Sequence, residues 1–126
     1  MLTSLDILLS FCKRNSVTIV GIIPPFADGV NEKLKNSKSY NYLKEINPPS
    51  LSVFDKYNFK LYDFTFPNSF GSNDGEMIDG FHGGELTYGK MLIKMLEAKL
   101  VLDKTSSLPK LKNNLKHSWN NFLVYK

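Results

Sequence analysis

Asp79 and His82 have the residue types and the spacing of a proton-transfer pair. A histidine that acts as a general base needs a carboxylate that fixes its tautomer and stabilises the imidazolium ion. An aspartate three residues earlier on a turn can reach Nδ1 of the ring, and this leaves Nε2 free to face a hydroxyl group. Gly80 permits the tight backbone that such a contact requires. Because ordinary histidine titrates at about pH 6.5, the pair suits general base catalysis, although a purely structural turn has the same pattern.

The stretch around this pair offers other chemistry as well. Its potential metal ligands are Asp74, Glu76, Asp79 and His82, but they lack the periodic spacing of a calcium loop. Two nearby serines, Ser69 and Ser72, are alternative nucleophiles. Residues 82–84 resemble the His-Gly-Gly oxyanion motif of some lipases, but the Gly-x-Ser-x-Gly elbow that follows it there is absent from this chain.

A turn-rich stretch positions these side chains. Residues 66–84 contain five glycines and one proline, and irregular loops of this length in compact domains are usually functional or disordered. Alternating apolar and polar residues predict a strand over 59–65, and residues 85–102 predict a helix after the loop. The loop would then lie at the carboxyl edge of a parallel sheet, where open α/β proteins bind ligands.

The N-terminal residues 3–13 predict a helix. Its apolar face consists of Leu5, Leu8, Leu9 and Cys12. Asn15 is expected to leave this helix in a left-handed conformation. Cys12 is the only cysteine of the chain, so the sequence excludes an internal disulfide and a cysteine-based zinc site, and Cys12 itself is expected to be buried.

The second strand is predicted from the β-branched run at residues 17–23, which Pro24 and Pro25 terminate. Because this run is apolar on both faces, it is typical of a central strand that helices cover. Further helices are predicted at 28–36, 39–45 and 51–57, with the prolines at 48 and 49 separating the last two. The predicted fold class is therefore α/β, with parallel strands near 17–23 and 59–65 and flanking helices.

Composition and charge limit the classes of partner. The chain has 126 residues, 42% of them hydrophobic and 22% charged, which is typical of one globular domain. Residues 86–126 hold eight lysines, no arginine and two acidic residues, and no nucleic-acid motif accompanies them, so no nucleic-acid partner is expected. No signal peptide is recognisable, and no apolar run approaches the roughly 20 residues that a membrane helix needs.

The last segment predicts an amphipathic helix with solvated lysines and an exposed His117. Its stripe consists of Leu108, Leu111, Leu115, Trp119, Phe122 and Leu123.

Residues 79–89, Asp-Gly-Phe-His-Gly-Gly-Glu-Leu-Thr-Tyr-Gly, resemble the terminal Asp-x-x-His block of the SGNH (GDSL-type) hydrolase and acyltransferase superfamily. In that superfamily the block lies before the last core helix and supplies the aspartate and histidine of the catalytic triad. Residues 19–25 resemble its late core strand, which ends in a proline-containing loop. Residues 24–26 and 54–64 look closest to the branch around the lipoteichoic-acid D-alanyl transfer protein. The resemblance implies that His82 is the general base and Asp79 its orienting carboxylate.

The chain departs from the superfamily because it has no Gly-Asp-Ser block to supply the nucleophile; residues 71–74, Gly-Ser-Asn-Asp, lie in the wrong place for it. The resemblance therefore implies that residues 1–102 are the C-terminal half of a three-layer, flavodoxin-like SGNH domain. An amphipathic helix over 103–126 would pack on this half or on a partner. The open sheet edge predicts a homo-oligomer or a partner chain that covers it.

The implied activity of the complete domain is hydrolysis or transfer of an acyl ester, with an acyl ester or acylated carbohydrate as substrate and no cofactor. The present chain alone is expected to be inactive, because it lacks the serine. The cytoplasm is the default location, and an extracytoplasmic one stays open for a full-length relative. The alternative is a non-catalytic interaction module that docks a partner through its C-terminal helix.

Overall fold

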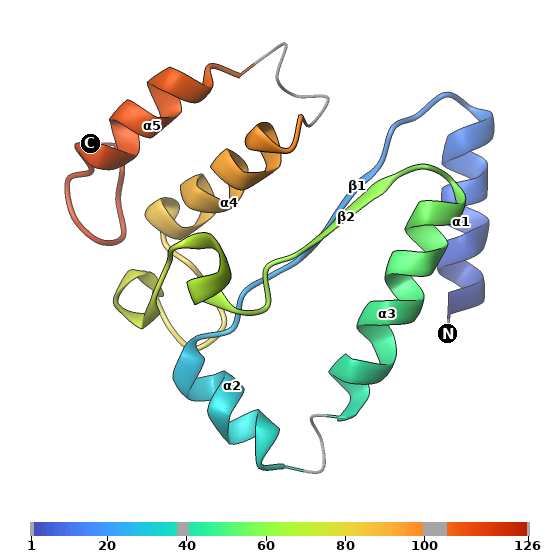
Figure 1. The fold of residues 1–126 in the computed structure, drawn as a ribbon, viewed down its shortest axis with the longest axis horizontal. Coiled ribbons are helices and arrows are strands. Elements are labelled where there is room, and N and C mark those ends of the chain that lie inside the picture. The colour runs from blue at the N-terminus through green and yellow to red at the C-terminus, as the bar shows by residue number, and fades with distance from the viewer. Residues whose placement is uncertain (1, 38–40, 100–105, 126) are drawn as a thin grey trace. The chain divides into compact units, whose positions relative to one another are not determined.

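The computed structural model describes residues 2–37, 41–99 and 106–125 (Figure 1). The chain divides into two compact units, and each unit contains two separate stretches of sequence. The first unit comprises residues 1–24 and 34–63, and the second comprises residues 25–33 and 64–126. The domain boundary predicted between residues 102 and 103 lies outside the described residues.

The first unit begins with helix α1, Leu2–Arg14, close to the predicted range. Leu9 and Cys12 are buried on one face of the helix, as predicted. The prediction was wrong for Leu8, which is 54% exposed. The buried face is centred on Leu9, and the adjacent position is rotated about 100° away from it in a helix with 3.6 residues per turn.

The turn after α1 and the next strand both differ from the predictions. The left-handed residue is Ser16, with φ 57°, whereas Asn15 donates its side-chain amide to a carbonyl of α1. Strand β1 covers Val20–Ile23, so it is shorter than the predicted run, and Val17 is exposed. Ile22 is 45% exposed, which corrects the expectation that both faces of this strand are buried. The apolar run is therefore a half-covered strand.

Strand β2, Lys60–Asp63, runs parallel to β1, and Val20 pairs with Lys60 at the start of the register. The parallel pairing confirms the prediction, although the predicted range 59–65 was longer. Among the described residues the sheet has two strands (Figure 1). A Cβ at Gly21 would lie 2.5 Å from the ring of Phe54, so glycine is needed for close packing on this face. The described residues thus form a small α/β fold.

Helix α3, Asn41–Lys56, is continuous where two helices were predicted. Pro48 and Pro49 lie inside it, and each removes a backbone donor from the helix. Pro48 and the preceding Glu45 are exposed, so water can reach this turn and hydrate carbonyl groups that lose their partners. The helix continues through the proline pair.

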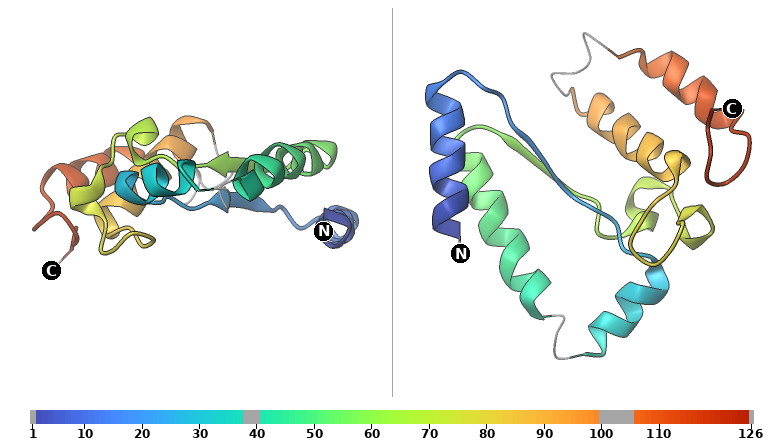
Figure 2. Two further views of the ribbon diagram at one scale, coloured as in Figure 1. Left: turned by 90° about the horizontal axis from the view of Figure 1, so that it is seen from below. Right: turned by 180° about the vertical axis from the view of Figure 1, so that it is seen from behind.

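The core of the first unit lies where α1 and α3 run side by side (Figure 2). Its buried members are Leu9, Cys12, Phe54 and Phe59. At the edge of this core, Asp6 accepts hydrogen bonds from Lys56 at 2.8 Å and from the Tyr57 hydroxyl at 2.9 Å. The hydrogen bond from Lys56 is the largest cause that holds the pKa of Asp6 below the ordinary value of a carboxyl group, and the bond from Tyr57 comes next.

The first stretch of the second unit, residues 25–33, contains most of helix α2, Asp28–Lys35. Asn31 on this helix is 2% exposed, and its amide donates to the carbonyls of Phe26 and Thr65 at 2.9 and 3.0 Å. Buried polar groups are retained when they are hydrogen-bonded. This amide therefore ties the two stretches of the unit together.

Helices α4, Glu85–Glu97, and α5, Leu108–Lys116, pack against one another. Their shared core contains Leu86, Leu115 and Val124, with Ile93 and Leu111 against it. The helix predicted to continue to residue 102 ends at Glu97, and residues 100–102 lie outside the described part of the chain. None of the described helices is long and apolar enough to cross a membrane.

The helical stripe predicted up to Leu123 is wrong beyond Lys116, where α5 ends. The side-chain oxygen of Asn120 accepts hydrogen bonds from the backbone N–H groups of Phe122 and Leu123, both at 2.8 Å. An asparagine that binds the backbone two residues on favours a turn over a helix. The chain reverses there, and the N–H of Trp119 donates to the carbonyl of Leu123 at 3.1 Å.

Candidate functional site

The loop that carries Asp79 and His82 lies between a short 3-10 helix, Asp74–Glu76, and α4. Asp79 Oδ1 accepts hydrogen bonds from the backbone N–H groups of Phe81, at 2.7 Å, and of His82, at 2.8 Å. Such an aspartate-centred turn brings a side chain three residues further on back toward the carboxylate. The local sequence therefore explains why the two side chains meet.

Position 80 suits glycine because a side chain would not fit there, not because the backbone needs a left-handed conformation. Its φ is not positive, and a Cβ there would lie 2.6 Å from a methyl group of Val30. The carbonyl of Gly80 accepts a hydrogen bond from the N–H of Ala27 at 3.0 Å. The glycine predicted to allow a tight turn instead allows the loop to pack closely on α2.

The contact between the two side chains is present. His82 Nδ1 lies 2.8 Å from Asp79 Oδ2 and 3.0 Å from Oδ1. The hydrogen bond from the ring is the main cause that holds the pKa of Asp79 below its ordinary value, and the N–H of Phe81 comes next. A carboxylate with these donors stays ionised, so it can orient the ring and stabilise an imidazolium ion.

The His82 ring stands on the surface, with its side chain 70% exposed and that of Asp79 52% exposed. Within the described part of the chain, Nε2 of His82 has no hydrogen-bond partner. Two exposed apolar side chains lie on the same loop: Ile78 at 66% and Phe81 at 56%. The second packs edge-on against Phe26, with 5.7 Å between the ring centroids. The arrangement can accept a proton at Nε2 from an incoming hydroxyl group.

The two serines proposed as alternative nucleophiles do not meet His82. Ser72 is 2% exposed, and its hydroxyl donates to Glu76 Oε2 at 2.8 Å. Ser69 is exposed, and its hydroxyl donates to the carbonyl of Phe66 at 2.7 Å. Neither hydroxyl makes a hydrogen bond to His82 in the described residues.

The metal-site alternative fails on geometry. Across residues 2–37, 41–99 and 106–125, no group of three or more His, Cys, Asp or Glu side chains is arranged to hold a metal ion. Asp74 accepts hydrogen bonds from the backbone N–H groups of Asp28 and Gly29 at the start of α2. Glu76 pairs with Lys90, and Asp79 pairs with His82, so the four potential ligands do not gather around one point.

Two other sequence predictions agree with the structure. Cys12 is a buried free cysteine, 7% exposed, within the core of the first unit. His117 is exposed at the end of α5, and its Nδ1 lies 2.9 Å from the carbonyl of Asn113. Neither residue joins the candidate site.

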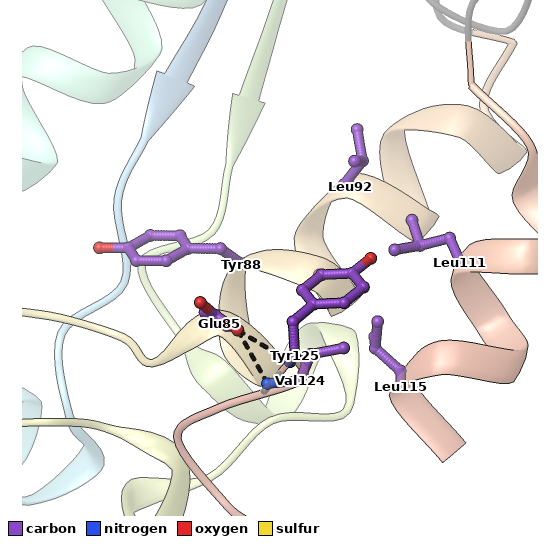
Figure 3. Close-up of a pocket in the computed structure, with 8 residues that line it drawn as sticks. Glu85, Tyr88, Leu92, Leu111, Leu115, Val124 and Tyr125 are labelled. Carbon is purple, nitrogen blue, oxygen red and sulfur yellow. Dashed lines mark hydrogen bonds between the residues drawn. The ribbon is translucent and has the colours of Figure 1, made fainter. Parts of the chain in front are cut away.

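An apolar pocket of about 370 Å³ lies between α4, α5 and the C-terminal segment (Figure 3). Its lining residues are Glu85, Tyr88, Gly89, Leu92, Leu111, Leu115, Val124 and Tyr125. In Figure 3 the ring of Tyr125 lies beside the leucines, whereas Tyr88 extends away from them. The Glu85 carboxylate accepts the N–H groups of Val124, at 2.8 Å, and Tyr125, at 3.3 Å. Beyond the leucine stripe, no pattern in the sequence predicts this pocket, because Val124 and Tyr125 reach it only through the reversal of the C-terminal segment.

Comparison of the chain with protein-family models, with curated proteins and with solved structures found no match.

Proposed function

We propose that this chain supplies the acid–base part of a serine-dependent acyl ester hydrolase or acyltransferase of the SGNH type. His82 is the general base, and Asp79 is the carboxylate that orients it. The observation that supports this assignment best is the 2.8 Å contact between His82 Nδ1 and Asp79 Oδ2. When Asp79 accepts a hydrogen bond from Nδ1–H, the neutral ring presents the lone pair of Nε2 to the outside.

The fold is compatible with this proposal. Residues 1–102 would be the C-terminal half of a three-layer, flavodoxin-like domain, and the parallel pairing of β1 with β2 supports this view. Parallel strands with flanking helices are the building units of that class of fold. The serine and the donors of the oxyanion hole would come from a segment that precedes this half or from a second chain.

In the complete site, His82 would take the proton of the serine hydroxyl while the serine oxygen attacks the ester carbonyl. The ring would then give this proton to the departing alcohol, and an acyl group would remain on the serine. Water or an acceptor alcohol would release the acyl group in the reverse order of proton transfers. General base catalysis of this kind contributes about 10²- to 10⁴-fold to the rate. The substrate class is an acyl ester, including an acylated carbohydrate.

The first test uses the isolated chain and p-nitrophenyl acetate. Because a nucleophile is missing, we expect hydrolysis no faster than with an equal concentration of free imidazole. The matched variant is His82→Ala. A faster rate that this substitution abolishes would contradict the proposed lack of a nucleophile.

The second test uses the polypeptide that is encoded upstream of residue 1 and joined in frame to this chain. We expect a Gly-Asp-Ser block in it, and ester hydrolysis that falls about 10²- to 10⁴-fold in His82→Ala. Asp79→Asn should lower the rate as well, because it removes the carboxylate that fixes the tautomer. An upstream sequence without a serine block, or hydrolysis that is indifferent to His82, would count against the assignment.

The second candidate function is a non-catalytic interaction module. The exposed side chains of Trp119, at 60%, and Phe122, at 43%, favour it. Leu111 and Leu115 pack against α4, however, so the available surface is smaller than the predicted stripe. A pull-down that depends on Trp119 but not on His82 would favour this function over the first.

A further inference from the structure

A buried polar cluster, with Ser72 and Glu76 before the Asp79–His82 loop and Thr87 after it, takes no part in the proposed proton transfer. Ser72, Glu76 and Thr87 are 2%, 7% and 0% exposed. The Glu76 carboxylate accepts hydrogen bonds from the Ser72 hydroxyl, at 2.8 Å, and from Lys90 Nζ, at 2.5 Å. Lys90 also donates to the carbonyl of Gly71 at 2.7 Å. Because a buried charge is costly without a partner, each member depends on the others.

The main chain of Glu76 closes the neck of the loop. Its carbonyl oxygen accepts the N–H of Gly84 at 2.9 Å and the hydroxyl of Thr87 at 3.0 Å. Immediately inside this point, Met77 and Gly83 form an antiparallel bridge. The two ends of the loop therefore meet at one residue whose side chain is fixed in the interior.

The exposed pair cannot hold its own geometry by charge alone. The side chains of Asp79 and His82 are more than half exposed, and exposed ion pairs contribute only about 0–1 kcal/mol. The local turn around Asp79 adds two backbone hydrogen bonds, but these also face solvent. Within the loop, the N–H of Ile78 also donates to the carbonyl of His82 at 2.7 Å, and the buried neck beneath the turn can constrain both ends of the loop.

We infer that Glu76 is a positioning residue: its buried contacts with Ser72 and Lys90 fix the neck of the loop and thereby hold Asp79 and His82 in contact. The catalytic importance of this positioning rests on the proposed function, but the contact itself does not. The contact with Glu76 also accounts for the partial burial of Lys90, whose side chain is 25% exposed.

The test compares Glu76→Gln and Lys90→Met with wild-type protein by NMR. One readout is the pH titration of the Asp79 carboxyl carbon, and another is the signal of the proton on His82 Nδ1. In both variants we expect the pKa of Asp79 to rise toward the value it has in His82→Ala, and the Nδ1 proton to exchange faster. The Gly84 amide should exchange about threefold to tenfold faster, as expected for the loss of one ordinary hydrogen bond.

The matched control is Glu97→Gln, which removes an exposed carboxylate that pairs with Lys112 at 2.7 Å. This variant should leave the Asp79 titration unchanged. If Glu76→Gln does not fold, Ser72→Ala is the second variant, because it removes one donor to the same carboxylate and the 3.1 Å hydrogen bond between Ser72 and Thr87 but leaves the Glu76–Lys90 pair in place. An unchanged Asp79 titration and an unchanged Nδ1 signal in folded Glu76→Gln and Lys90→Met, or in Ser72→Ala, would overturn the inference. These NMR readouts do not involve ester hydrolysis. The positioning role of Glu76 can therefore be supported even if the proposed function is refuted, and it can be refuted even if that function is supported.

Discussion

Gly84 is the position where a single methyl group should disturb the candidate site and the C-terminal segment together. The residue is buried, and it precedes α4. A Cβ there would lie 2.8 Å from Cα and 2.9 Å from the carbonyl oxygen of Phe122, and 3.2 Å from the carbonyl oxygen of Glu76. All three neighbours are backbone atoms, so no side-chain rotation can relieve the contact in Gly84→Ala.

The expected loss of stability in Gly84→Ala follows from the backbone atoms that must move to admit the methyl group. Ordinary contacts of a Cβ begin at 3.4 Å, so Phe122 must retreat by several tenths of an ångström. The N–H of Glu85 donates to the carbonyl of Phe122 at 2.7 Å, and this bond would be strained or lost. Overpacking costs about 1–3 kcal/mol, and one lost hydrogen bond adds about 1 kcal/mol. We therefore expect Gly84→Ala to lower the free energy of unfolding by about 2–4 kcal/mol and Tm by roughly 10 °C.

The assay is urea unfolding followed by circular dichroism, with Gly71→Ala as the control. Gly71 has φ 81° and no atom within 4 Å of an added Cβ. Gly71→Ala should therefore lower the free energy of unfolding only through the left-handed backbone, by about 1 kcal/mol. A chain that ends after Asn121 lacks the obstructing backbone, and in it Gly84→Ala should cost less. The packing argument would be refuted if Gly84→Ala and Gly71→Ala lowered the free energy of unfolding equally. It would also be refuted if the truncation did not change the effect of Gly84→Ala.

Three further outcomes are expected. Leu9→Ala should lower the free energy of unfolding by about 3–5 kcal/mol because Leu9 is fully buried, whereas Leu8→Ala should change it by less than about 0.5 kcal/mol in the same urea titration. Folding lowers the pKa of Asp79, so the resulting stabilisation is complete above the unfolded value of about 3.9 and is lost as the pH falls through the lower folded value. The difference in Tm between wild type and Asp79→Asn should therefore shrink below about pH 4, and a difference that grows on acidification would contradict this sign. Asp6→Asn should reduce Tm at low salt but not in 1 M NaCl, where the screening length of about 3 Å weakens the exposed pair with Lys56; an equal loss at both salt concentrations would speak against an ionic contribution.

The parts of the structure that depend on neighbouring residues could be predicted from the sequence. The Asp79–His82 contact is of this kind, because the turn that forms it lies within residues 79–82. The apolar run at 17–23 and the alternating residues at 59–65 likewise predict strands, and the helix that precedes the first of them favours a parallel pairing. In both cases the periodicity or spacing of residues contains the relevant physical information.

The parts that depend on distant residues could not be predicted. Glu76 and Lys90 are fourteen residues apart, and only the folded loop shows that they pair in the interior. The continuous helix through Pro48 contradicts the local rule for proline, and the turn at Asn120 interrupts an otherwise regular apolar stripe. At Asn120, two hydrogen bonds to the backbone override the pattern of side-chain hydrophobicity.

The two compact units are interleaved in the sequence, since the chain passes from one to the other after residues 24, 33 and 63. No single truncation or protease cut can therefore release either unit as one uninterrupted polypeptide. Expressing residues 64–126 alone would omit residues 25–33, including Asn31, which bridges the two stretches of that unit. A circular permutant or a linker that bypasses residues 34–63 would be the route to studying the His82 loop in isolation.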